Sequence, residues 1–129
     1  FMASAMIHDL PDCLAMVEGA EALNGGLIVD IAHTNALGIT NEQVAAIPGR
    51  YLVSVELGDN HKRTTPGYDP GARRYCGEGE LDVAGFIAAA RATGYAGPWA
   101  VEVFNRDPQD WPLEKLDEAA YRTTLPFLS

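Results

Sequence analysis

Apolar residues along this chain fall into short continuous runs, separated by longer stretches in which they recur every three or four positions. Continuous runs are typical of parallel strands covered on both faces, and the recurring pattern is typical of helices with one buried face. We therefore predict strands at residues 1–4, 27–31, 51–57 and 100–104. We predict helices at residues 11–23, 41–47, 83–93 and 112–125.

Residues suited to helix ends stand at the predicted boundaries. Asp9 or Asp12 is a candidate N-cap for the first helix, and Thr40 and Asp82 are candidates for the next two. Pro112 suits the first position of the last helix, since proline lacks the N–H that this position leaves unpaired. The predicted alternation of strand and helix indicates βαβ units, and hence a parallel sheet with helices outside it.

Three of the apolar runs end in a single acid. The runs cover residues 26–30, 52–56 and 99–102, and the acids are Asp30, Glu56 and Glu102. A carboxylate among aliphatic residues costs several kcal/mol unless it is paired or binds a metal. Because α/β proteins place their chemistry at the carboxyl ends of strands, the repetition predicts a divalent cation held by these oxygens, with nitrogen help from His33.

Each of these residues also has a plainer interpretation. We favour Asp30 as a ligand, and the alternative is a helix cap or the partner of an arginine. Glu56 would instead pair with Arg50 or with the arginines at 73–74. A lone histidine such as His33 is often structural. Residues 58–79 form a long polar loop, and loops of this length in compact domains are commonly functional or disordered.

Composition narrows the function. The chain has 129 residues, the size of one domain, and a formal net charge of −9, which argues against a nucleic-acid partner. No apolar run approaches the roughly 18 residues that span a bilayer, so we expect no membrane partner. Cys13 and Cys76 lack metal-type spacing and suggest no disulfide framework, so we expect a cytoplasmic protein. No glycine-rich phosphate motif follows a predicted strand.

Four segments taken together resemble one known group of proteins, the sugar phosphate isomerase/epimerase family of xylose isomerase-like TIM barrels. The resemblance runs over essentially the whole chain, and its specificity comes from the ordered set of motifs. The segments are VDIAH at 29–33, VSVELGD at 53–59, RYCGEGELD at 74–82 and GYAGPWAVEVF at 94–104.

The resemblance implies a (β/α)8 barrel of which residues 1–129 form the C-terminal half, from about strand five to the last helix. It assigns Asp30, Glu56 and Glu102 as metal ligands, and it expects a further ligand, a glutamate, directly before Phe1. Many family members have His or Gln where this chain has Glu56. By the same resemblance His33 contacts the substrate, and Arg74 binds a substrate oxygen or phosphate.

The resemblance also implies a reaction. We expect a metal-dependent isomerase or epimerase acting through an enediolate on a small sugar-like keto substrate, with Glu102 and His33 catalytic. Oxygen ligands favour Mn²⁺ or Mg²⁺, and the histidine admits Zn²⁺ or Co²⁺. The alternatives are a metal-dependent dehydratase of a keto acid or inosose, or a non-catalytic half-barrel. We expect the chain to form a homo-oligomer or to pair with the missing barrel half, because a half-barrel exposes sheet edges.

Overall fold

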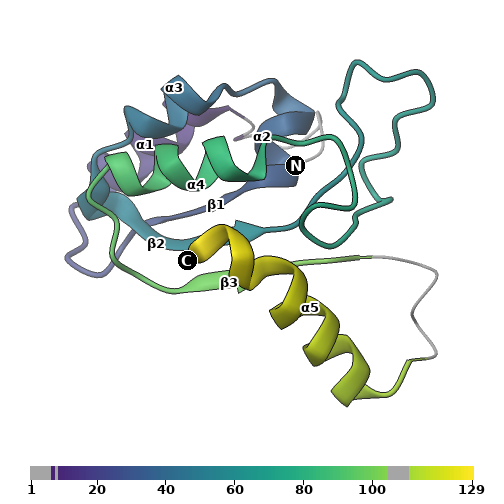
Figure 1. Cartoon of the computed structure of the whole chain (residues 1–129). Coiled ribbons are helices and arrows are strands. Elements are labelled where there is room, and N and C mark those ends of the chain that lie inside the picture. The colour runs from purple at the N-terminus through teal and green to yellow at the C-terminus, as the bar shows by residue number, and fades with distance from the viewer. Residues whose placement is uncertain (1–6, 8, 105–110) are drawn as a thin grey trace.

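The computed structural model describes residues 7, 9–104 and 111–129, and the strand predicted at residues 1–4 lies outside them. Strands and helices alternate along most of this length, as the hydrophobic pattern predicted (Figure 1). The elements are α1 (Leu10–Ala20), β1 (Leu27–Asp30), α2 (Ile31–Leu37), α3 (Asn41–Ala45), a 3-10 turn (Gly49–Tyr51), β2 (Leu52–Leu57), α4 (Val83–Ala92), β3 (Trp99–Val101) and α5 (Leu113–Leu128).

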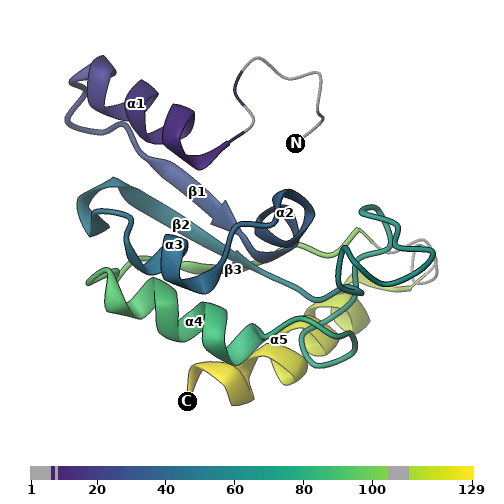
Figure 2. The same cartoon turned by 90° about the horizontal axis from the view of Figure 1, so that it is seen from above.

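The three strands form one parallel sheet in the order β1-β2-β3, which confirms the parallel sheet predicted from the sequence. Asp30 pairs in register with Glu56, and Glu56 pairs with Ala100, so the ends of all three strands meet at one edge. Seen from above, helix α2 and the long loop between β2 and α4 lie at this same end of the sheet (Figure 2). The edge therefore gathers the residues that follow each strand.

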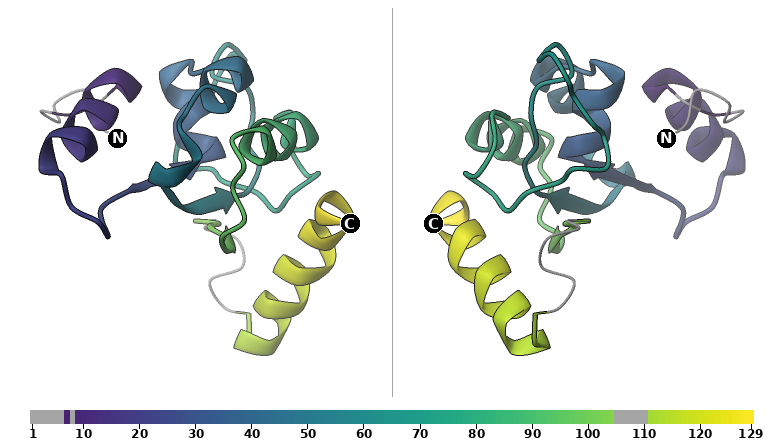
Figure 3. Two further views of the ribbon diagram at one scale, coloured as in Figure 1. Left: turned by 90° about the vertical axis from the view of Figure 1, so that its left-hand side faces the viewer. Right: turned by 90° about the vertical axis from the view of Figure 1, so that its right-hand side faces the viewer.

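The helices α1, α3, α4 and α5 form an arc along one side of the sheet (Figure 3). Side chains on that side of β1 and β2 are buried, whereas Ile28, which points the other way, is 59% exposed. The core lies between the sheet and the helices, because burying apolar surface there removes it from water, which is favourable in proportion to the area buried. Its most deeply buried members are Val44, Val55, Leu57, Phe86, Ile87 and Ala90.

Helix α2 was not predicted. The strand was expected to continue through Ile31, but it ends at Asp30 and a helix begins at Ile31. The Asp30 carboxylate caps this helix by accepting hydrogen bonds from the N–H groups of Ala32 and His33. The apolar side chain of Ile31 gave no sign of the change, because it is buried in either conformation.

Other boundaries differ by a few residues. Asp9, not Asp12, caps α1, which ends at Ala20 rather than near residue 23. Strand β3 is shorter than the predicted 100–104, and α5 continues to Leu128 with Pro112 in the N-cap position. Thr40 and Asp82 cap α3 and α4 as predicted. None of the helices within the described residues is both long and apolar enough to cross a membrane.

Candidate metal centre

Asp30 ends β1 with its side chain 5% exposed and both carboxylate oxygens engaged. Oδ1 accepts the backbone N–H groups of Ala32 at 2.6 Å and His33 at 2.9 Å. Oδ2 accepts a hydrogen bond from Arg73 Nη1 at 2.7 Å. Both plainer interpretations of this acid, the helix cap and the arginine partner, are therefore realised. The backbone bonds also fix the direction in which the carboxylate points.

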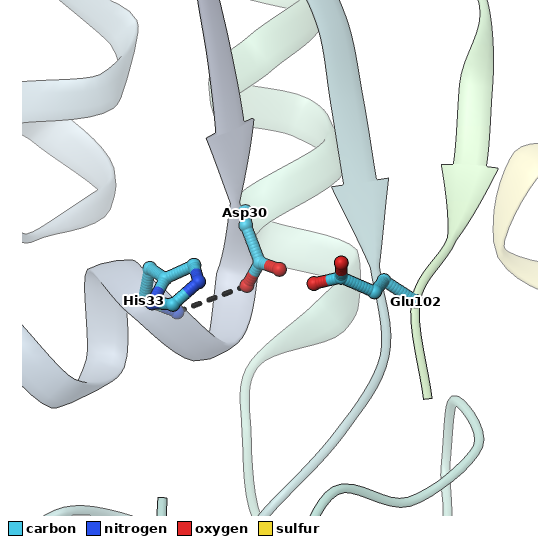
Figure 4. A group of neighbouring side chains, drawn as sticks. All are labelled: Asp30, His33 and Glu102. Carbon is cyan, nitrogen blue, oxygen red and sulfur yellow. Dashed lines mark hydrogen bonds between the residues drawn. The ribbon is translucent and has the colours of Figure 1, made fainter. Parts of the chain in front are cut away.

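Glu102 directly follows β3, where its backbone N–H donates to the carbonyl of Leu57 at 2.9 Å and extends the sheet ladder by one bond. Its carboxylate points toward that of Asp30 (Figure 4). It also accepts a hydrogen bond from Arg73 Nη1. Burial, together with a hydrogen bond to Asp30, raises the pKa of the Glu102 carboxyl, and the charge of Arg73 opposes this.

His33 lies in the first turn of α2, and its ring is beside the two carboxylates (Figure 4). Nε2 is 3.1 Å from Arg73 Nη2. An arginine can only donate, so Nε2 accepts, and the ring is the neutral form with its proton on Nδ1. Burial lowers the pKa of His33, which favours the same form, although the nearby Asp30 charge works against it. Neutral imidazole is the form that binds metals.

Asp30, His33 and Glu102 together can hold a metal ion. Each offers one ligand atom, and these three atoms lie within 4.8 Å of one another. The guanidinium of Arg73 is bonded to both carboxylates and lies 3.1 Å from His33 Nε2, so a metal held by these three side chains would take its place. Two carboxylates and one imidazole are a donor set used for Mn²⁺, Zn²⁺ and Co²⁺. The residues present therefore fit a divalent metal.

Arg73 was not among the predicted site residues, which included its neighbour Arg74. Arg73 is 5% exposed, which is unusual for an arginine, and its guanidinium carbon is 5.3 Å from the centre of the Phe104 ring. A signal was available, since acids at the ends of strands of one sheet require a compensating cation, and the chain has few arginines. That argument does not by itself distinguish two consecutive arginines.

Arg74 lies away from this group. Its Nη2 is 3.5 Å from His61 Nε2, and His61 in turn is 3.4 Å from Glu80 through Nδ1. Its Nε is buried and has no hydrogen-bond partner among the described residues. Arg74 therefore makes no bond to Asp30 or Glu102 within the described residues, and its assignment to a substrate oxygen or phosphate remains a prediction.

Glu56 sits in the middle of the strand-end row, between Asp30 and Ala100, and is half-buried. Burial raises the pKa of its carboxyl, and the charges of Glu102 and Asp30 raise it further. It forms no ion pair with the arginines proposed for it within the described part of the chain. Nor is it among the residues whose ligand atoms converge. Its assignment as a ligand remains a prediction.

With this geometry in hand, comparison with known families is informative. The sequence profile of the xylose isomerase-like TIM barrel family matches residues 2–128, and the chain belongs to that family. The resemblance noted from the four motifs is thereby confirmed, as is the fold class.

Three similar proteins illustrate the relationship. A 3-dehydroshikimate dehydratase from Pseudomonas aeruginosa is 35% identical over 92 residues, which are 70% of this chain and 14% of that protein. The structure of a fusion of a xylose isomerase-like TIM barrel with a 4-hydroxyphenylpyruvate dioxygenase is 29% identical with a TM-score of 0.77, covering 91% of this chain and 19% of that one. The structure of the IOLI protein with a bound zinc atom has a TM-score of 0.87 at 20% identity.

The lengths differ in a consistent way. The match to the IOLI protein covers 98% of this chain but 46% of the other, so the chain spans about half of that barrel. It spans a still smaller part of the dehydratase.

Proposed function

We propose that this chain carries the metal-binding side of an active site that removes a proton beside a carbonyl group in a small sugar-like substrate. The observation that carries the proposal is the convergence of Asp30, His33 and Glu102 at the carboxyl ends of parallel strands. Active sites of TIM-barrel enzymes lie at this end of the barrel. Asp30 and Glu102 would hold the cation, and His33 is placed to add a nitrogen ligand or to orient a substrate hydroxyl.

A bound divalent cation would supply Lewis-acid polarisation of the substrate carbonyl, which makes the neighbouring C–H more acidic. Glu102 has access to solvent through about a third of its side chain, so it can meet both the cation and the substrate. We assign it the proton transfer. Arg73 presents a buried guanidinium to the same space, where it suits a substrate carboxylate or oxyanion.

Among the reactions open to such a site, we favour loss of water from a cyclic keto acid over isomerisation. The support is the 35% identity to a 3-dehydroshikimate dehydratase, which covers 70% of this chain. In that reaction a base removes the proton beside the carbonyl, and a hydroxyl group leaves from the next carbon and departs as water. The isomerase or epimerase expected from the sequence shares the first step. It is the second candidate, because the four motifs are compatible with both reactions and only the dehydratase has the further support of sequence identity.

We also assign the chain to the C-terminal half of the barrel. The coverage of 46% of the IOLI protein supports a half-barrel, and the ordered motifs support its second half. A fourth ligand would then come from a strand preceding residue 1. Pairing of the chain with a first half, or with a second copy of itself, follows as part of the same proposal.

Turnover measurements on the purified protein test the reaction. The protein is stripped of metal, reloaded with Mn²⁺, Mg²⁺, Co²⁺ or Zn²⁺ in turn, and supplied with 3-dehydroshikimate. Dehydration creates a conjugated product that is followed by its ultraviolet absorbance, and ketoses and inososes are screened for isomerisation in parallel. We expect dehydration that disappears in Glu102→Gln but persists in the exposed variant Glu114→Gln. Isomerisation without dehydration would favour the second candidate, and no turnover with any metal would refute both.

A further inference from the structure

Asp59 is a buried acid to which the proposed mechanism gives no role. It stands two residues beyond β2, and it is 1% exposed. Oδ1 accepts the backbone N–H groups of Asn60 at 2.8 Å and Leu81 at 3.0 Å. Oδ2 accepts those of Gly77 at 3.0 Å and Gly79 at 2.9 Å. Four main-chain donors therefore converge on one carboxylate.

These amides take the place of a counter-ion. No arginine, lysine or histidine of the described residues pairs with Asp59, yet a buried carboxylate is stable only if its charge is compensated. The main chain has approached closely to provide that compensation. A methyl group at Gly79 would overlap Asp59 Oδ1 and the carbonyl of Asn60, and Gly77 has a φ of +84°, which side chains disfavour. Glycine at these two positions suits the close wrapping of the loop around the carboxylate.

The main chain of Asp59 is also bonded to the segment that carries the buried arginine. Asp59 N donates to the carbonyl of Arg74 at 2.8 Å, and Arg74 N donates to the carbonyl of Asp59 at 2.9 Å. Arg73, the preceding residue, turns its side chain onto Asp30 and Glu102. Asp59 thus holds both the 77–81 turn and the 73–74 segment, one through its side chain and one through its backbone.

A second acid in the same loop provides a contrast. Glu80 accepts the N–H of Lys62 at 3.0 Å and the hydroxyl of Thr65 at 2.7 Å, and it is 3.4 Å from His61. These bonds hold the 61–65 limb of the loop at the surface. Their link toward Arg73 runs only through the His61 ring, whose Nε2 is 3.5 Å from the side chain of Arg74. Glu80 is therefore a matched control, since it is an acid that ties together the same loop without a bond to the backbone of residues 73–74 or 77–79.

We propose that the Asp59 carboxylate is a positioning residue, which fixes the 58–82 loop so that the Arg73 guanidinium lies against Asp30 and Glu102. The proposal rests on the function proposed above for these carboxylates. It adds a residue that touches neither metal nor substrate, and acts through Arg73.

The direct test is nuclear magnetic resonance of the arginine side chain, without metal or substrate. The Nε–H and Nη–H signals of Arg73 are assigned by their loss in Arg73→Lys, and they are then recorded in Asp59→Asn and Glu80→Gln. Asparagine keeps the size of the side chain but loses two of the four acceptor bonds, because its NH₂ group faces N–H donors. We expect the Arg73 signals to move to the positions of a solvent-exposed arginine in Asp59→Asn and to stay unchanged in Glu80→Gln.

A kinetic measurement separates positioning from a general loss of structure. If the protein turns over 3-dehydroshikimate, we expect kcat/KM to fall about 10- to 100-fold in folded Asp59→Asn, because small misplacements of a substrate-orienting group have effects of this order. In Glu80→Gln the fall should stay below about twofold. In the Arg73→Lys background the Asp59→Asn change should have little further effect, since coupled residues are not additive.

Unchanged Arg73 signals in folded Asp59→Asn, or equal changes in both loop variants, would overturn the proposal. The signals are read without metal or turnover, so a failure of the proposed function leaves this test intact. Should Asp59→Asn not fold, hydrogen exchange in the unaltered protein gives the answer. We expect the amides of Arg74, Gly77, Gly79 and Leu81 to exchange slowly and together, and fast exchange at 77–81 beside a protected Arg74 would contradict the proposal.

Discussion

Neighbouring residues of one strand belong to two very different regions of this protein. Val55 and Leu57 are almost completely buried under the helices, whereas Glu56 between them points toward the side of Asp30. The helix side of the sheet is an apolar core, and the strand ends carry buried charges that depend on Arg73 for compensation. Apolar side chains in the core need no specific partner, whereas each charged side chain at the strand ends needs the others to compensate its charge.

The largest effect should come from the apolar region. Phe86→Ala removes a ring of α4 that belongs to the apolar core and is 1% exposed, and we expect it to lower the free energy of unfolding by about 3–5 kcal/mol. Leu113→Ala, at a position 68% exposed, is the control and should change it by about 0.5 kcal/mol or less. Urea unfolding measures both. Equal effects of the two changes would mean that the core has been wrongly located.

A change in the charged region should depend on metal. Arg73→Met leaves two facing carboxylates without a cation, so the free energy of unfolding should fall by about 2–4 kcal/mol when metal is absent. Added Mn²⁺ should then raise the melting temperature of this variant more than that of the unaltered protein, because the cation replaces the guanidinium. Arg63→Met, at an exposed position, is the control. If Arg73→Met is as stable as the parent and insensitive to metal, the carboxylates at the strand ends do not depend on Arg73 for compensation of their charge.

Within the charged region, Asp30 and Glu56 should differ. Asp30→Asn should weaken binding of Mn²⁺ or Co²⁺ by about 100-fold or more, whereas Glu56→Gln should weaken it by about tenfold, the lower end of the range for a residue that neighbours the ligands. Isothermal titration calorimetry gives both affinities. Comparable losses would restore Glu56 to the ligand set predicted from the sequence.

The smallest effect concerns pH. The hydroxyl of Thr65 and then the N–H of Lys62 lower the pKa of Glu80. Because the folded pKa lies below the unfolded value of about 4.3, Glu80 contributes stability above pH 4.3 that is lost as the pH falls through the folded pKa. Glu80→Gln should therefore flatten the acid limb of a plot of unfolding free energy against pH. An unchanged acid limb would show that these bonds do not distinguish the folded state.

Much of the fold could be predicted from the sequence, because the spacing of apolar residues and the capping residues indicate strands and helices. Thr40 and Asp82 were found this way. Helix α2 was not, because Asp30 has two roles, as the end of a strand and as the cap of a helix. The cap was named as an alternative for Asp30, but no helix was predicted after it.

The candidate site was accessible to a lesser degree. Asp30 and Glu102 were predicted from their positions at strand ends, and His33 from its position three residues after Asp30. The structure brings the three side chains together. The choice between Arg73 and Arg74 was beyond the sequence because it depends on which of the two side chains turns inward. Arg74 forms a backbone bridge with Asp59, and successive side chains of an extended segment point to opposite sides, so Arg73 and Arg74 face different surroundings. Contacts between residues far apart in the chain are fixed by such bridges, and no local pattern reports them.

Asp30, His33 and Glu102 are proposed to bind a divalent metal. Elemental analysis decides this when it is made on the purified protein and on Asp30→Ala and Glu102→Ala, with Glu114→Ala as the surface control. We expect close to one Mn, Zn, Co or Mg per chain in the parent and the control, and a large loss in both site variants. A parent without metal even after loading, or site variants that retain it, would mean that these three side chains do not form a metal site.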